Sequence, residues 1–492
     1  FFSDRGHKTL ACGYYDEKVL KRSLNWADLA QRTPGCVGIA YCTWGDNWKL
    51  LGEFGDMVRR KADQVSAGGI YPHLAMYNDE GECGTGALLP WAGSLWAVTY
   101  APHAPSGSSD RLYRISPDLT REIHPASVGG TPANRIIHRE TDQAMIGPYM
   151  IDAKGSVRTV PPSKMPGRLT AAARHLTDPE NKIYVATMDN GLYELDLRSL
   201  AFRTLLRDHN GRGGWANVGI AETPDWAAAL ENKLPGSHTK GMSTGYGRIF
   251  LANNGEYVEA ARTNPRIPAG VLASTDPAGG DQRVIRRCQF TDVTTPDGVY
   301  GNEHPDNNPV WSLGWDAKSV LFACREKEGW SYYRLPKASH TYDGAHGWNT
   351  EWPRIREIGK GDLLATMHGT LWRFPRTFRP GAAAGIRPRS TFLKITGDFC
   401  RWGDRIVFGC DDSAKSEFMN KRRAKGALKG PARSQSNLWF VDPSRLDDLG
   451  PCSGWAGIFD REDVAARTVG DPLLAAGYDF KWLWLSGGTF DV

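Results

Sequence analysis

The sequence predicts an all-β fold of the β-propeller type, on three observations. A five-residue pattern recurs along the chain, helical periodicity nearly vanishes after residue 67, and the 492 residues include 55 glycines. The pattern is an apolar residue, an aromatic, any residue, an apolar residue and then Asp, Pro or Ser, as expected for a half-buried strand that ends in a turn. Its six copies begin at Leu112, Pro148, Leu192, Tyr332, Leu371 and Leu438.

The spacing of these copies indicates how the strands are arranged. Successive copies begin 36, 44, 140, 39 and 67 residues apart, and the interval of 140 corresponds to roughly three further units. A period of about 40–50 residues made of short strands is typical of blades stacked radially around an axis. One blade cannot bury its own faces, so the whole ring is needed for stability. We therefore predict a propeller over residues 67–492, with one short inserted helix from Pro224 to Asn232.

Residues 1–65 follow a different pattern. Two strand-like segments alternate with two amphipathic helical segments, 23–32 and 47–61. This βαβα order is the unit of a parallel α/β fold. It is similar to the last two units of a (β/α)8 barrel, with Trp44 where such barrels place substrate platforms. A small α/β decoration packed on the propeller is an equal alternative.

Composition limits the functions to be considered. The 18 Trp, 17 Tyr and 17 Phe fit a propeller with aromatic packing between blades, although some of them could form stacking surfaces for a ligand. The net charge of +5 includes only one long basic run, Lys421–Lys425, which favours a solvated loop over a nucleic-acid site. A modest positive balance suits an acidic glycan. No window approaches 18 apolar residues, so we expect no membrane span.

The cysteines and the chain start give two further expectations. Nine cysteines, an odd number without metal-binding spacing, predict mostly buried thiols. The chain begins at Phe1 without a signal peptide, so we expect a processed or truncated product whose export signal is not visible. We expect no cofactor. A structural divalent cation bound at the acidic turn 411–417 is an open alternative.

Histidines in polar loops are the main candidates for chemistry. Several of them sit beside Arg, Asn or Tyr, and strand ends of this kind can converge on the central funnel of a propeller. Convergence of His, Arg and Tyr is what acid–base chemistry on a sugar requires. For any single histidine, a structural hydrogen bond is the simpler interpretation. The histidines in question are His73, His103, His138, His175, His238, His340, His346 and His368.

One segment, residues 342–354, is unusually dense in groups that recognise carbohydrate. Aromatic, amide and charged side chains lie within thirteen residues, which is costly to fold unless the loop is used. No P-loop, dinucleotide fingerprint, H-E-x-x-H or nucleophile elbow is present. We expect a substrate-facing loop that includes His346, Trp348, Asn349 and Trp352.

Several segments together resemble a known group of enzymes. They are 82–87, 129–135, 333–354, 397–402 and 408–417. They are similar to the seven-bladed propellers of glycoside hydrolase family 145 and their lyase relatives, which act on L-rhamnose linked α-1,4 to D-glucuronate. The resemblance covers roughly residues 67–492 and implies seven blades.

The resemblance implies two alternative sets of site residues. In the hydrolases a single histidine near the start of the first blade is implicated, and His73 matches it best. The lyase relatives use His, Tyr and Arg on the opposite face to remove the C5 proton of a uronate after its carboxylate is neutralised. The candidates here are His138 and His175 as base or neutraliser, Tyr246 or Tyr184 as acid, Arg135 and Arg168 as carboxylate clamps, and His103 as a further substrate-binding group.

Three functions follow as hypotheses. The first is an exo-acting α-L-rhamnosidase that removes terminal rhamnose from glucuronate by hydrolysis. The second is a polysaccharide lyase that cleaves the same bond by β-elimination, and the third is a non-catalytic glycan-binding propeller. In each case the expected partner is an acidic oligo- or polysaccharide, without nucleic acid, and we expect a monomer in the periplasm or outside the cell.

Overall fold

The structure is a computed structural model, and part of the chain is described by it. The predicted α/β segment 1–65 and Trp44 lie outside the described part. The described residues are 74–78, 84–100, 109–129, 133–160, 164–165, 167–188, 191–208, 224–255, 258, 260–261, 264, 266–338, 353–359, 361–382, 385–391, 395–413 and 434–483.

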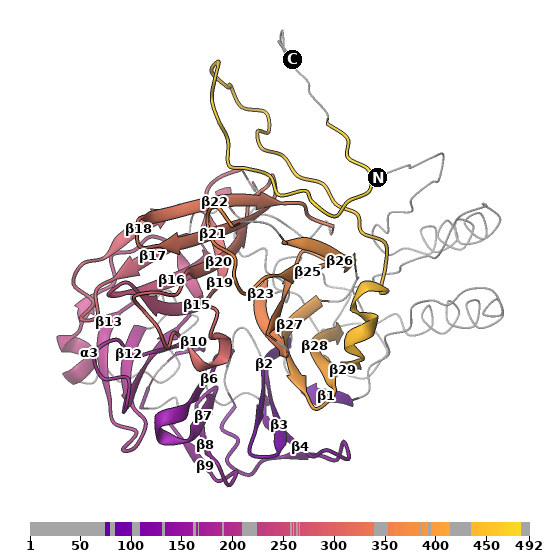
Figure 1. The fold of residues 1–492 in the computed structure, drawn as a ribbon. Helices are drawn as coiled ribbons and strands as arrows, with labels where there is room; N and C mark the ends of the chain where they lie inside the picture. The colour runs from indigo at the N-terminus through magenta and orange to yellow at the C-terminus, as the bar shows by residue number, and fades with distance from the viewer. Residues whose placement is uncertain are drawn as a thin grey trace, which may run out of the picture.

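The described strands form seven sheets placed radially around one axis (Figure 1), which confirms the predicted seven-bladed β-propeller. Six blades use strands that are consecutive in the chain. The first four blades are β2 (Gly84–Trp91), β3 (Ser94–Tyr100), β4 (Leu112–Ile115) and β5 (Arg121–Ile123); β6 (Arg135–His138), β7 (Gln143–Ile146), β8 (Tyr149–Asp152) and β9 (Val157–Thr159); β10 (Leu169–Arg174), β11 (Lys182–Thr187), β12 (Gly191–Asp196), β13 (Phe202–Arg207) and β14 (Leu230–Glu231); and β15 (Ser237–Gly245), β16 (Arg248–Gly255), β17 (Val271–Thr275) and β18 (Arg283–Arg286).

The seventh blade combines the two ends of the ring. The strand β1 precedes blade 1 in the chain, yet it pairs antiparallel with β29 at the outer edge of blade 7. This pairing joins strands more than 350 residues apart and closes the ring. The last three blades are β19 (Gln289–Thr294), β20 (Val310–Trp315), β21 (Val320–Glu326) and β22 (Gly329–Leu335); β23 (Arg354–Gly359), β24 (Asp362–Met367), β25 (Thr370–Phe374) and β26 (Arg387–Thr391); and β27 (Ile395–Trp402), β28 (Arg405–Ser413), β29 (Ser434–Val441) and β1 (Leu74–Asn78).

Helices are few and short in the described part of the chain. The inserted helix predicted from Pro224 to Asn232 is present but shorter: α3 spans Pro224–Ala228, and residues Leu230–Glu231 form the strand β14 instead. No helix there is long and apolar enough to cross a membrane. The three short 3₁₀ helices are η1 (Arg139–Thr141), η3 (Gly298–Tyr300) and η5 (Pro443–Asp447).

The recurring sequence pattern mostly marks the third strand of a blade. Five copies form β4, β8, β12, β25 and β29, whereas the copy at Tyr332 lies in β22, the fourth strand of blade 5. The expectation of three units in the 140-residue interval is wrong. That interval contains only one whole blade between blades 3 and 5, because it also includes α3, β14 and the long loop 295–309, and because the copy in blade 5 lies one strand later than the others.

The aromatic residues fill the spaces between blades, as the composition predicts. Trp311 and Phe322 of blade 5 pack with Trp372 and Phe374 of blade 6 in one buried cluster. The rings of Trp311 and Phe374 meet edge to face at 4.8 Å, an arrangement that adds to the area that they bury. Neighbouring blades are therefore held mainly by shared apolar cores.

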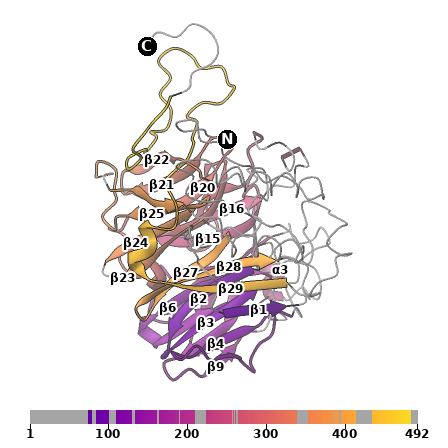
Figure 2. The ribbon, with the colours of Figure 1, turned by 90° about the vertical axis from the view of Figure 1, so that its right-hand side faces the viewer.

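A segment that follows the last blade, residues 451–483, crosses the outer edge of blade 5 (Figures 1 and 2). Arg334 of β22 forms a parallel bridge with Leu473, and Asp471 pairs with Arg286 at 2.6 Å. An edge strand exposes unpaired backbone groups that invite association, so this segment partly covers such an edge.

Ring closure gives a stability prediction at Met76, a residue of β1 that is 1% exposed among apolar side chains of blades 1 and 7. Met76→Ala removes this buried side chain and is expected to lower the free energy of unfolding by about 2–5 kcal/mol. Urea unfolding followed by tryptophan fluorescence measures the change.

The control for this variant is Ile123→Ala on β5, an outer strand where Ile123 is 55% exposed. We expect a change within about 0.5 kcal/mol there. Equal effects of the two substitutions would contradict the role of β1 in ring closure.

Candidate functional site

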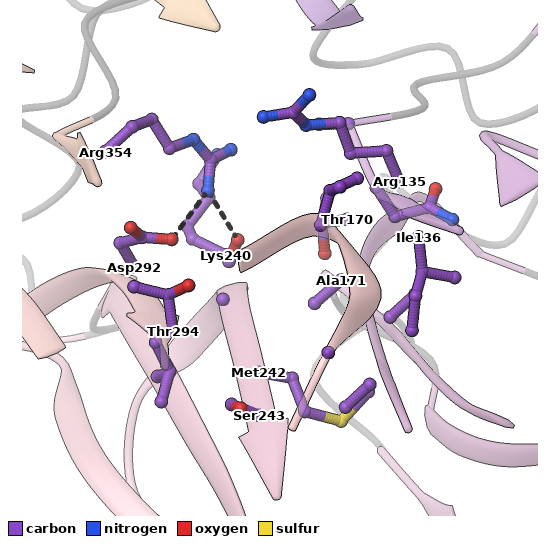
Figure 3. Close-up of a pocket in the computed structure, with 18 of the residues that line it drawn as sticks. Arg135, Ile136, Thr170, Ala171, Lys240, Met242, Ser243, Asp292, Thr294 and Arg354 are labelled. Atoms are coloured by element: carbon purple, nitrogen blue, oxygen red, sulfur yellow. Dashed lines mark hydrogen bonds and ion pairs between the residues drawn. The ribbon is translucent and has the colours of Figure 1, made fainter. Parts of the chain in front are cut away.

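The axis of the propeller carries the candidate site. The innermost strands β2, β6, β10, β15, β19, β23 and β27 contact one another in ring order. A cavity of about 60 Å³ lies among β6, β10, β15, β19 and β23. Its charged lining residues are Arg135, Lys240, Asp292, Arg354 and Arg356, and Figure 3 shows Arg135 and Arg354 extending toward the same region near Lys240 and Asp292.

A β-bulge recurs at the same place in several of these inner strands. The pairing with the second strand slips by one residue at Thr170 in β10, Lys240 in β15, Thr291 in β19 and Gly397 in β27. A bulge leaves one residue unpaired and re-aims the neighbouring side chains. In β19 and β27 the residue that follows the bulge is an aspartate.

Asp398 follows the bulge of β27 and ties blade 7 to blade 1. Its Oδ2 accepts a hydrogen bond from the backbone N–H of Leu88 in β2 at 2.9 Å and lies 3.2 Å from Nε of Arg135. Its Oδ1 accepts from Nε of Arg356 at 3.1 Å. Arg135 completes the contact, because its Nη1 donates to the carbonyl of Leu88 at 2.7 Å. One buried carboxylate on blade 7 therefore contacts blades 1, 2 and 6.

Asp292 repeats this arrangement between blades 5 and 6. Its Oδ2 accepts from the backbone N–H of Ile355 in β23 at 2.8 Å. Arg356 approaches Oδ1 at 3.3 Å and Arg354 at 3.6 Å. The two aspartates thus share Arg356, and the ion pairs form one continuous network across the axis.

The cations of this network outnumber the carboxylates, and the pKa values reflect it. Burial lowers the pKa of Arg354 to about 10, and neighbouring Arg356 adds to the shift against the opposing effects of Asp292 and Asp398. Burial, followed by the charges of Arg168 and Arg354, lowers the pKa of Lys240 well below its ordinary value. The site therefore favours an anionic ligand.

The loop between β19 and β20 covers one end of the axis. Val299 of η3 donates its backbone N–H to the carboxylate of Glu357 in β23. Gly301 has φ of +72° and lies against Arg174 of β10, where a Cβ would come within 3.0 Å of the Arg174 side chain. The loop thus spans from blade 6 to blade 3, at the end where the inner strands finish.

An apolar cluster lies at the other end of the axis, near the start of the inner strands. It consists of Tyr100, Ala133, Met188 and Trp315. Lys240 reaches it, because Nζ lies 3.8 Å from the sulfur of Met188 and 5.9 Å from the centre of the Tyr100 ring. Lys240 therefore connects the cluster with the cavity.

The two described histidines of the predicted site, His138 and His175, are not among the residues that line this cavity. Nε2 of His138 lies 2.8 Å from the carbonyl of Pro179, and its Nδ1 lies 2.9 Å from the hydroxyl of Thr141. Nδ1 of His175 accepts the backbone N–H groups of Thr177 and Asp178. Burial is the main cause that lowers the pKa of both rings. Both side chains have structural hydrogen bonds at each ring nitrogen.

The two predicted tyrosines lie outside the cavity as well. Tyr184 stacks on the His175 ring at 4.2 Å, and Nε2 of His175 lies 3.0 Å from Glu194. Tyr246 lies in the turn between β15 and β16, where its backbone N–H donates to Pro305. The structure thus brings His175 and Tyr184 together, but neither with Arg135.

Of the predicted carboxylate clamps, Arg135 lines the cavity and Arg168 lies close enough to Lys240 to lower its pKa. The sequence interpretation missed Lys240, Asp292, Arg354 and Arg356. The two aspartates end similar tripeptides, Phe290-Thr-Asp292 and Thr396-Gly-Asp398, in two inner strands. This shared position was the sequence feature from which they could have been recognised. The other candidates, His73, His103, His346, Trp348, Asn349 and Trp352, lie outside the described residues.

No group of three or more His, Cys, Asp or Glu side chains in the described part of the chain could hold a metal ion. The five described cysteines are free thiols, and four of them are buried, as predicted.

Scans against protein-family models and curated proteins find no match. Among solved structures, the WD40 repeats of RRP9 align with 9% identity and a TM-score of 0.41, over 74% of this chain and 97% of that one. The WD40 β-propeller domain of Doa1 aligns with 7% identity and a TM-score of 0.40, over 75% and 97%.

The network makes Asp398 a test of stability and of its pH dependence. Burial alone would raise its pKa, but Arg135 and Arg356 outweigh burial and hold the pKa below the ordinary value. Its stabilising effect is therefore present above pH ~4 and is lost as the pH falls through the lower, folded-state pKa. Asp398→Asn leaves buried arginines without this carboxylate and is expected to cost about 3–5 kcal/mol at pH 7.

Denaturant unfolding of both proteins between pH 7 and pH 3 measures this effect. The difference between wild type and Asp398→Asn should shrink toward the acidic end. Asp404→Asn is the control, because the Asp404 side chain is 86% exposed in the turn after β27. If Asp398→Asn were as stable as the control at pH 7, the network would not hold the blades together.

Proposed function

We infer that this protein is a carbohydrate-active enzyme that removes terminal L-rhamnose from α-1,4-linked D-glucuronate in acidic glycans. The observation that supports this inference best is the excess of cations on the axis. Arg135, Arg354 and Arg356 line one cavity in which Asp292 is the one carboxylate among the described lining residues. A glucuronate carboxylate would balance this charge.

The cavity has a volume of about 60 Å³, which is enough space for a carboxylate group. The sugar itself would lie at the end where the inner strands begin, since the loop 295–309 covers the opposite end. Tyr100 and Trp315 lie at that end within the buried apolar cluster.

The charge distribution favours β-elimination over hydrolysis. The C5 proton of a uronate is weakly acidic, and neutralising the carboxylate is what makes its removal feasible. Arginines fixed by Asp292 and Asp398 are preorganised for this purpose. Hydrolysis at His73 is the alternative that the resemblance implies, and there the same cations would serve only to bind the substrate. An acidic plant-type glycan as substrate implies a periplasmic or secreted enzyme.

The direct test is incubation with α-L-rhamnosyl-(1→4)-D-glucuronate. Free rhamnose is followed by chromatography, and the unsaturated uronate is followed by its ultraviolet absorbance. We expect equal amounts of rhamnose and of the absorbing product. Rhamnose without absorbance would indicate hydrolysis and move the chemistry to His73.

The control substrate is α-L-rhamnosyl-(1→4)-D-glucose, which lacks the carboxylate. We expect no detectable cleavage of it, because the cationic cavity would have no ligand. Absence of rhamnose from the glucuronate substrate would contradict the enzyme proposal and leave a glycan-binding propeller.

A further inference from the structure

Lys240 occupies an unusual position for a lysine. It occupies the bulge position of β15, its side chain is completely buried, and it lines the axial cavity. Lysine is almost never fully buried without interacting groups around it, because removing an ammonium group from water is costly. The long side chain runs from the cavity to the apolar cluster of Tyr100 and Met188.

The backbone at this position is held by a neighbouring blade. Gly241 follows Lys240, and a Cβ on it would come within 2.8 Å of the backbone nitrogen of Val293 and 2.9 Å of the carbonyl of Thr291. Only glycine allows β15 and β19 to approach this closely. The bulge, and with it the direction of Lys240, is therefore fixed before any ligand binds.

Charged groups surround Lys240 from every inner strand that lines the cavity. They are Arg135 on β6, Arg168 just before β10, Asp292 on β19, and Arg354 and Arg356 on β23. Asp398 on β27 belongs to the same network. Tyr100 contributes its ring from blade 1. Burial, followed by the charges of Arg168 and Arg354, lowers the pKa of Lys240 and so favours the neutral amine, the form that can accept a proton.

We propose that Lys240 is the catalytic base of this propeller and removes the C5 proton of the glucuronate whose carboxylate Arg354 neutralises. This role rests on the proposed function and specifies its chemistry. The electron pair of the C5–H bond forms the C4=C5 double bond as the C4–O bond breaks. The departing oxygen leaves with rhamnose and takes up one proton, so no water or oxidant is consumed.

This assignment differs from the histidines that the sequence favoured. Both ring nitrogens of His138 and of His175 have hydrogen-bonding partners in turns away from the cavity. Lys240, in contrast, lines the cavity together with the arginines that would hold the carboxylate. Elimination requires both kinds of group next to the same sugar carbon.

Two substitutions in the full-length chain test the role of Lys240. Lys240→Met keeps the length of the side chain in an apolar form, and Lys240→Arg keeps a cation that cannot act as a base. We expect each to lower kcat for elimination by about 10²–10⁴-fold, with KM changed far less. The wild-type kcat should fall at acidic pH as the amine becomes protonated, and the residual activity of Lys240→Met should lack this limb.

The matched control is Lys337→Met. Lys337 is also completely buried, but its Nζ donates to the carbonyl of Asp316 at 2.8 Å and stacks over Trp455. We expect it to retain the wild-type kcat. Circular dichroism and thermal unfolding confirm that all variants are folded.

The outcomes separate this proposal from the proposed function. Elimination by the wild type and a kcat retained by Lys240→Met or Lys240→Arg would overturn the role of Lys240 alone. Rhamnose release without an unsaturated product would also overturn it, while leaving the substrate assignment intact. No rhamnose from the wild type would overturn both.

Discussion

The structure depends on buried carboxylates that link one blade to the next. Asp292 and Asp398 each accept the backbone N–H of the inner strand in the following blade and each pair with Arg356. Burying a charge is costly, and the cost is offset only when partners surround it. These contacts fix the spacing of the inner strands at the axis, where the apolar cores between blades do not reach. Because Asp398 bridges blades 7 and 1, it closes the ring from inside, while β1 closes it at the outer edge.

The same network accounts for the chemical character of the axis. Two aspartates orient three arginines, and the positive charge in excess of these two carboxylates faces the cavity together with Lys240. A site that must bind a carboxylate gains from groups held rigidly before the ligand arrives. Fold stability and the proposed recognition of glucuronate therefore depend on the same few residues, and the bulges that position them serve both purposes.

The sequence predicted the blades but not the contacts at the axis. Each aromatic strand carries its own local pattern, so β4, β8 and β12 could be recognised without their neighbours. The partners of the aspartates are distant in sequence: Leu88 and Asp398 are 310 residues apart, and Asp292 and Ile355 are 63 apart. No local period reveals such pairs. His175 shows the opposite case, a residue that the sequence suggested for the site but that the structure places in a turn. Its ring accepts hydrogen bonds from the nearby backbone N–H groups of Thr177 and Asp178.

The most direct test of this account is a crystal structure of the protein with D-glucuronate bound. The account predicts that the carboxylate occupies the axial cavity within hydrogen-bonding distance of Arg354, with C5 directed toward Lys240. Glucuronate bound elsewhere on the propeller, with water alone in the axial cavity, would contradict it.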